Sequence, residues 1–121
     1  ARNLKGDLIN ESEVINGISF IGKQLTLEQN AVKDLVFEIG NDRENLFILL
    51  GTVTNDKPML TCFISKDLVA SRDLNAGQVV RELGKLIQGG GGGQPFYATA
   101  GGRRPEGIPE AIEKARELLK S

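Results

Sequence analysis

Apolar residues recur at helical spacing in three stretches of the chain and predict three helices. Capping-box pairs, Thr26 with Gln29 and Asn75 with Gln78, stand where the first two would begin. Pro109 stands at the first position expected for the third. The predicted helices cover residues 27–39, 76–88 and 109–119.

Continuous or alternating apolar runs predict four strands. Residues 46–53 are apolar almost throughout, which is typical of a strand covered on both faces. A hairpin turn at residues 54–57 connects them to the next strand, and residues 65–68 are interpreted as a turn. The strands are predicted at residues 14–25 (with a bulge), 46–53, 59–64 and 96–100.

This order predicts an α/β or α+β fold, β-α-β-β-α-β-α, with one mixed sheet packed by helices. The length of 121 residues suits one domain with its own core. Residues 1–12 are polar with a few apolar residues near helical spacing, and we interpret them as the end of an upstream helical connector. The domain itself is then residues 13–121.

The composition argues against several kinds of chemistry. The sequence has no His and a single Cys, Cys62, so it lacks the commonest general base and the usual transition-metal ligands. We therefore expect no catalytic residue and no metal site. One Cys excludes an internal disulfide and favours a reducing compartment such as the cytoplasm. No apolar run is long enough to span a membrane.

The most unusual stretch is residues 88–105, in which five consecutive glycines, Gly89–Gly93, precede Gln94 and Pro95. Such a run is costly to order, so it is either a flexible linker or a loop that presents bare backbone to a partner. Charge is uneven around it. Residues 1–78 hold 8 basic and 11 acidic residues, whereas residues 79–121 hold 7 basic and 5 acidic ones.

A second glycine-containing loop, Gly101-Gly102-Arg103-Arg104-Pro105, follows a predicted strand and precedes a helix. Free backbone N–H groups, a helix N-terminus and two guanidinium groups would make it the best anion site in the chain. The alternative is a solvated turn. The intervening strand would hold the two loops roughly 16 Å apart, a distance that a nucleic-acid backbone can bridge.

Phe96 and Tyr97 are adjacent in the last predicted strand, so their side chains face opposite sides of the sheet. Either ring could pack in the core or be exposed for base stacking.

Several of these segments together resemble the DHH-associated domain family, in the form found at the C-terminus of bacterial alanyl-tRNA synthetases. The resemblance covers about residues 14–120. It rests on Asn75-Ala76-Gly77 opening a helix, the run Gly89–Gly93 with Gln94-Pro95, Ala100-Gly101-Gly102, and Ile108-Pro109-Glu110-Ala111.

The resemblance implies a non-catalytic domain that grips the outer corner of alanine-specific tRNA and helps to couple aminoacylation with editing. The parent would be a cytoplasmic, ATP-dependent alanine–tRNA ligase that uses ATP, Mg and Zn in other domains, with no cofactor in this segment. Those other domains and a second copy of the chain are the further partners implied. The implied RNA-binding residues are Gly89, Gly90, Gly91, Gly92, Gly93, Gln94, Arg103 and Arg104.

The family commonly has Arg where Gln94 stands and a basic residue within the glycine run, so Arg103 and Arg104 are expected to supply the positive charge. Two other functions stay open. One is the nucleic-acid-binding domain of a DHH-type phosphodiesterase, and the other is a dimerisation module without RNA contacts.

Overall fold

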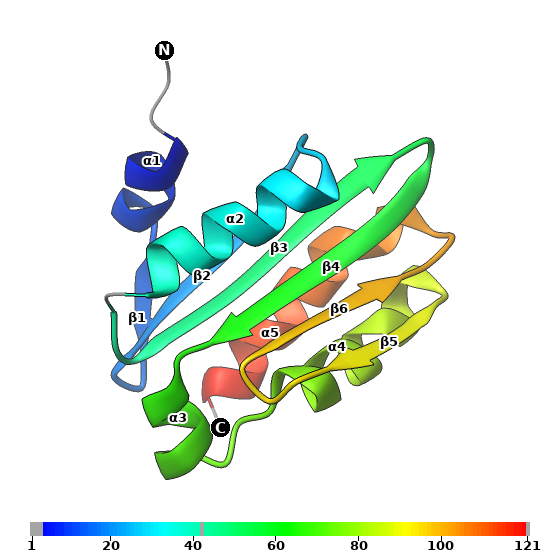
Figure 1. Ribbon diagram of the computed structural model, residues 1–121. Helices are drawn as coiled ribbons and strands as arrows, with labels where there is room; N and C mark the ends of the chain where they lie inside the picture. The colour runs from blue at the N-terminus through cyan, green and yellow to red at the C-terminus, as the bar shows by residue number, and fades with distance from the viewer. Residues whose placement is uncertain (1–3, 42, 121) are drawn as a thin grey trace.

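The computed structural model describes residues 4–41 and 43–120, which form one six-stranded mixed sheet between two layers of helices (Figure 1). The strand order is β1-β2-β3-β4-β6-β5. Only β2 and β3 are parallel. The strands are β1 (Glu13–Ile15), β2 (Ile18–Leu25), β3 (Leu46–Thr54), β4 (Lys57–Ile64), β5 (Gly90–Gly93) and β6 (Tyr97–Gly101).

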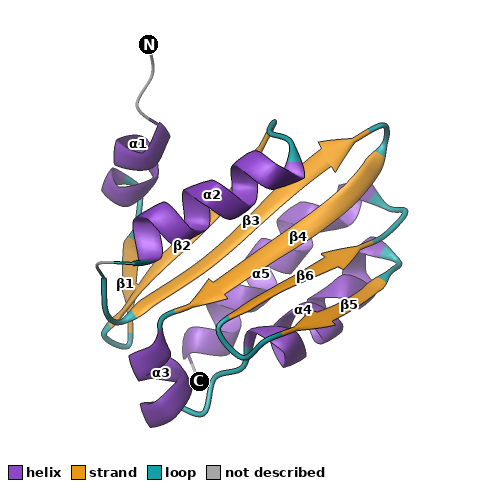
Figure 2. Ribbon diagram, in the orientation of Figure 1, coloured by secondary structure: helices purple, strands orange, loops and turns teal. Residues whose placement is uncertain are grey.

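The helices lie on both faces of this sheet (Figure 2). One face is covered by α2, with α1 beside it, and the other by α4 and α5, while α3 lies at one end. The helices are α1 (Leu4–Asn10), α2 (Gln29–Gly40), α3 (Lys66–Ser71), α4 (Ala76–Gly84) and α5 (Ile108–Lys120), with short 3₁₀ turns η1 (Lys85–Ile87) and η2 (Pro105–Gly107). The predicted mixed α/β architecture is therefore confirmed.

Strand β3 is buried on both faces, as its continuous apolar run predicts. Phe47 and Leu49 belong to the core beneath α4 and α5, whereas Ile48 and Leu50 belong to the core beneath α2. Cys62, on the neighbouring β4, is fully buried, and burial raises the pKa of its thiol far above the ordinary value. It is a small core residue, in agreement with the sequence.

The region predicted as one bulged strand, residues 14–25, is instead the hairpin β1–β2. Asn16 and Gly17 form its turn with φ values of 51° and 82°. Both residue types tolerate this left-handed conformation, and Asn-Gly is a strong two-residue hairpin signal. The break in apolar character at these two residues was therefore a turn and not a bulge.

The capping box predicted at Thr26 is wrong. Helix α2 begins at Gln29, its N-cap residue is Glu28, and no side-chain cap hydrogen bond is present. Gln29 instead donates from Nε2 to Thr61 Oγ1 on β4, at 3.3 Å. A tertiary contact with the sheet has replaced the local cap. Of the second predicted capping box, the N-cap half is confirmed: Asn75 Oδ1 accepts a hydrogen bond from the Gln78 amide at 3.2 Å.

The turn predicted at residues 65–68 is the start of helix α3. Ser65 and Asp67 fix this helix against the start of β3, accepting hydrogen bonds from the amides of Leu46 (3.0 Å) and Asn45 (2.9 Å) respectively. Burial opposes the charged form of Asp67, but hydrogen bonds from Ser65 and the Asn45 amide outweigh it and lower the pKa of this carboxyl group.

Within residues 1–12, of which residues 1–3 lie outside the described part, α1 covers Leu4–Asn10, and its Leu8 is buried in the core beneath α2. Whether this helix continues an upstream connector stays a prediction. Across residues 4–41 and 43–120, no helix combines the length and the apolar character needed to cross a bilayer.

Candidate nucleic-acid interface

The glycine run is an edge strand and not a loop. Gly90–Gly93 form β5, which pairs antiparallel with β6 so that Gly90 lies opposite Gly101 and Gly93 opposite Ala98. The last predicted strand, residues 96–100, is β6 at residues 97–101. Glycine propensity disfavours a strand, but Gly89, Gly91 and Gly93 pack so closely against the β6 segment that a side chain would not fit there.

Pairing in a hairpin also corrects the expected separation of the two glycine-containing segments. The separation of roughly 16 Å expected between the two loops is wrong where Gly89 meets the second loop. A Cβ added to Gly89 would lie within 3.0 Å of the Gly101 backbone. Gln94 lies at the other end, in the turn, where its amide donates to the Tyr97 carbonyl at 2.8 Å. The structure therefore brings Gly89 beside Gly101 and Gly102 and holds Gln94 away from them.

Alternate glycines of the run are required by packing. A Cβ at Gly89, Gly91 or Gly93 would come closer than 3.0 Å to backbone atoms of the β6 segment. Helix α4 approaches the other side closely through Gly77 and Gly84, where a Cβ would meet backbone atoms of Gly93 at 3.1 Å and Gly90 at 3.3 Å. Glycine at residues 89, 91 and 93 thus follows from the fold itself.

The remaining glycines have no such explanation. A Cβ on Gly90, Gly92 or Gly101 would meet no atom within 4 Å, and none of the three has a left-handed φ. Gly90 pairs with Gly101 and Gly92 pairs with Thr99, so all three glycines lie on one face of the hairpin. We call Gly90, Gly92 and Gly101 the glycine face. It is bare backbone that a flat or bulky partner can approach closely.

The second loop does not offer the free N–H groups expected from the sequence. The amide of Gly102 donates to the Pro58 carbonyl at 3.1 Å, and those of Arg103 and Arg104 both donate to the Ile87 carbonyl, at 2.8 and 2.9 Å. These bonds fix the loop between η1 and β4. An anion at this position must therefore be bound by side chains.

The two arginines of this loop differ in their surroundings. Arg104 is engaged within the protein: Nη1 donates to the Leu86 carbonyl at 3.2 Å and Nη2 lies 3.8 Å from a Glu110 carboxylate oxygen. Arg103 is exposed, and its guanidinium has no hydrogen bond or ion pair within residues 4–41 and 43–120. Of the two, Arg103 is the one whose guanidinium has no partner among the described residues and is the more available to a ligand.

A second cation joins Arg103 at a shallow depression whose walls include Gly89, Gly101 and Gly102. This is Lys57, the first residue of β4, which is exposed and has no ion pair with any residue that the structure describes. We call Lys57 and Arg103 the basic pair. Sequence reasoning missed Lys57, because only the β4–β6 register, with Met59 opposite Gly101, places the β3–β4 turn beside the glycines.

Nothing in this arrangement resembles a metal site. Among the described residues, no three His, Cys, Asp or Glu side chains are grouped so that they could hold a metal ion. What the surface combines is close access to backbone with two unpaired positive charges at one end, which suits a phosphate-bearing polymer.

The sequence matches a known domain family. The model of the DHHA1 domain matches residues 17–121, so the chain belongs to the DHHA1 domain family. It is similar to the alanine–tRNA ligase of Christiangramia forsetii, with 53% identity over 99% of this chain and 14% of that ligase. It is also similar to the alanine–tRNA ligase of Bacteroides fragilis, with 49% identity over 95% of this chain and 13% of the ligase.

Among solved structures, the chain is similar to the C-Ala domain of Aquifex aeolicus alanyl-tRNA synthetase, with a TM-score of 0.82 and 25% identity over 92% of this chain and 99% of that domain. The chain is thus homologous to the C-terminal domain of alanyl-tRNA synthetase. It spans about one seventh of the length of the ligases that it matches.

Proposed function

We propose that this chain is a tRNA-binding domain of an alanine–tRNA ligase and that it grips the outer corner of alanine-specific tRNA. The glycine face packs against the RNA backbone, and the basic pair binds phosphates beside it. The observation that supports this most strongly is that Gly90, Gly92 and Gly101 are glycine at positions where an added Cβ would meet no atom within 4 Å.

In this proposal, other domains of the parent ligase carry out its chemistry. Aminoacylation and editing, with their ATP, Mg and Zn, belong to other domains of the longer protein. The present domain increases the local concentration of one tRNA near both active sites, as a second binding module on the same chain does. The similarity to alanine–tRNA ligases favours this function over that of a phosphodiesterase domain.

The test is a Lys57→Ala/Arg103→Ala double variant of this chain. Each cation that contacts a phosphate contributes about 0.9 to the slope of log K against log salt on duplex nucleic acid, so we expect the slope to fall by about 2 units. tRNA affinity should fall with it. Titrations of labelled tRNA at four salt concentrations, followed by fluorescence anisotropy, measure both quantities.

Arg81 and Lys85 provide a matched control. Arg81 is exposed on α4, on the opposite face of the sheet, and Lys85 lies just beyond it in η1, near Glu82 at 3.9 Å. Replacing both with Ala removes the same charge and should leave the salt slope unchanged. Equal losses in the two double variants would mean that binding depends only on net charge and would contradict the proposal.

A further inference from the structure

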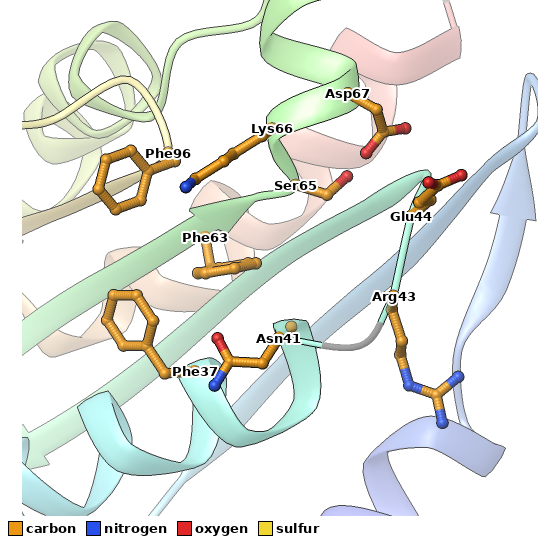
Figure 3. Close-up of a pocket in the computed structure, with 10 residues that line it drawn as sticks. Phe37, Asn41, Arg43, Glu44, Phe63, Ser65, Lys66, Asp67 and Phe96 are labelled. Atoms are coloured by element: carbon orange, nitrogen blue, oxygen red, sulfur yellow. The ribbon is translucent and has the colours of Figure 1, made fainter.

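A cavity of about 340 Å³ opens between the C-terminal end of α2 and the start of α3 (Figure 3). This is the size of a small-molecule site. In the close-up, the rings of Phe37, Phe63 and Phe96 line one side of the cavity, with Asn41 and Lys66 near them. The basic pair does not line it.

The aromatic side of the cavity is built from three separate elements. Phe63 on β4 is almost fully buried, and Phe37 on α2 packs edge-on against it with the ring centroids 5.4 Å apart. Phe96, in the β5–β6 turn, is half-buried, and the Lys66 ammonium lies 5.8 Å from the centre of its ring. Partly exposed rings next to a cation suit a flat, polarisable ligand.

On the polar side of the cavity, the Asn41 amide is available to a ligand. Ser65 and Asp67 already accept hydrogen bonds from the start of β3. The Asn41 side chain is exposed and makes no hydrogen bond within residues 4–41 and 43–120, and its amide points toward Phe37 in Figure 3. An Asn amide offers both donors and an acceptor, which is what the edge of a nucleobase requires.

The cavity adjoins the glycine face on the same side of the sheet. Tyr97 lies two residues from Thr99 and four from Gly101 along β6, so the three side-chain directions coincide. The Tyr97 ring packs against Phe37, with centroids 5.0 Å apart. The four residues of β5 separate the cavity from the basic pair by roughly 13 Å, so one RNA chain can occupy both.

We propose that this cavity binds an unstacked nucleobase of the RNA that the glycine face contacts, an inference that rests on the function proposed above. The base stacks on Phe37 and Phe96, its edge hydrogen-bonds to Asn41, and Lys66 binds the adjacent phosphate. Single-stranded or looped RNA is commonly recognised through bases stacked on aromatic side chains.

The five phenylalanines of the chain provide the measurement, with 4-fluorophenylalanine incorporated and observed by ¹⁹F NMR. On titration with each of the four nucleoside 5′-monophosphates, the resonances of Phe37, Phe63 and Phe96 should shift for at least one of them. Phe20 and Phe47 pack against each other in the core beneath α4 and α5, 5.9 Å between centroids, and should not shift. No shift, or equal shifts at all five, would overturn the proposal.

Two variants separate this inference from the proposed function. Asn41→Ala, at an exposed position, should weaken binding of the shifting nucleotide about fivefold, the value of one hydrogen bond. Lys57→Ala/Arg103→Ala should weaken tRNA binding but leave the nucleotide shifts intact. If no nucleotide shifts the ¹⁹F resonances while tRNA binding still depends on the basic pair, only the cavity inference is wrong. If nucleotides shift the Phe37 and Phe96 resonances while loss of the basic pair leaves tRNA affinity unchanged, only the proposed function is wrong.

Discussion

Gly91→Val should destabilise the protein by about 2 kcal/mol, within the range of about 1–3 kcal/mol measured for overpacked sites. Its Cβ would lie within 3.0 Å of the Thr99 carbonyl oxygen and of Ala100 Cα. Both are backbone atoms of β6, so no side-chain rotation relieves the contact. Either β5 separates from β6, or both shift against α4.

Thermal unfolding measures this effect. For a domain of this size, 2 kcal/mol corresponds to a fall in melting temperature of roughly 8 °C. The matched control is Gly92→Val, one residue along the same strand, where an added Cβ meets no atom within 4 Å. An unchanged melting temperature for Gly91→Val would show that the close approach of β5 to β6 is incorrect.

Gly90→Val/Gly92→Val should fold normally and lose most tRNA binding. Both positions are open and neither has a left-handed φ, so Val adds no clash and has a better strand propensity than Gly. In the complex, however, two branched side chains would stand between the backbone and the RNA. We expect a loss of at least tenfold in affinity, about 1.4 kcal/mol.

The outcome of that experiment distinguishes a binding surface from a structural filler. Circular dichroism and thermal unfolding establish that the variant is folded, and anisotropy titration at fixed salt gives the affinity. A folded variant with undiminished tRNA binding would remove the glycine face from the interface and leave only the basic pair. Substitution of Gly91 alone could not give this answer, because it changes stability as well.

The parts of the fold that could be predicted are those whose signal is local. The apolar run of β3, the Asn75 cap and the apolar stripe of α5 each lie within a short stretch of sequence, and the structure has them in place. The local predictions that were wrong are those at residues that make a tertiary contact instead. Gln29 donates to Thr61 on β4 instead of completing a capping box. Ser65 accepts a hydrogen bond from the Leu46 amide at the start of β3 and leads into helix α3 instead of closing a turn.

In the candidate site, too, the sequence predicted the local features and missed those that depend on tertiary contacts. Glycine-rich sequence correctly marked residues 89–93 and 101–102 as unusual, but their secondary structure depended on pairing with β6 and on packing with α4. The availability of Arg103, the engagement of Arg104 and the presence of Lys57 all follow from long-range register. Such long-range contacts produce no periodic pattern from which a single sequence could predict them.

If this domain recognises the outer corner of tRNA, the unmodified chain should distinguish two RNAs that differ in that corner. One is full-length alanine-specific tRNA, and the other is a minihelix of its acceptor and T stems that lacks the folded corner. We expect the chain to bind the full tRNA at least tenfold more tightly at equal salt, about 1.4 kcal/mol. Equal affinity for the two RNAs would contradict it.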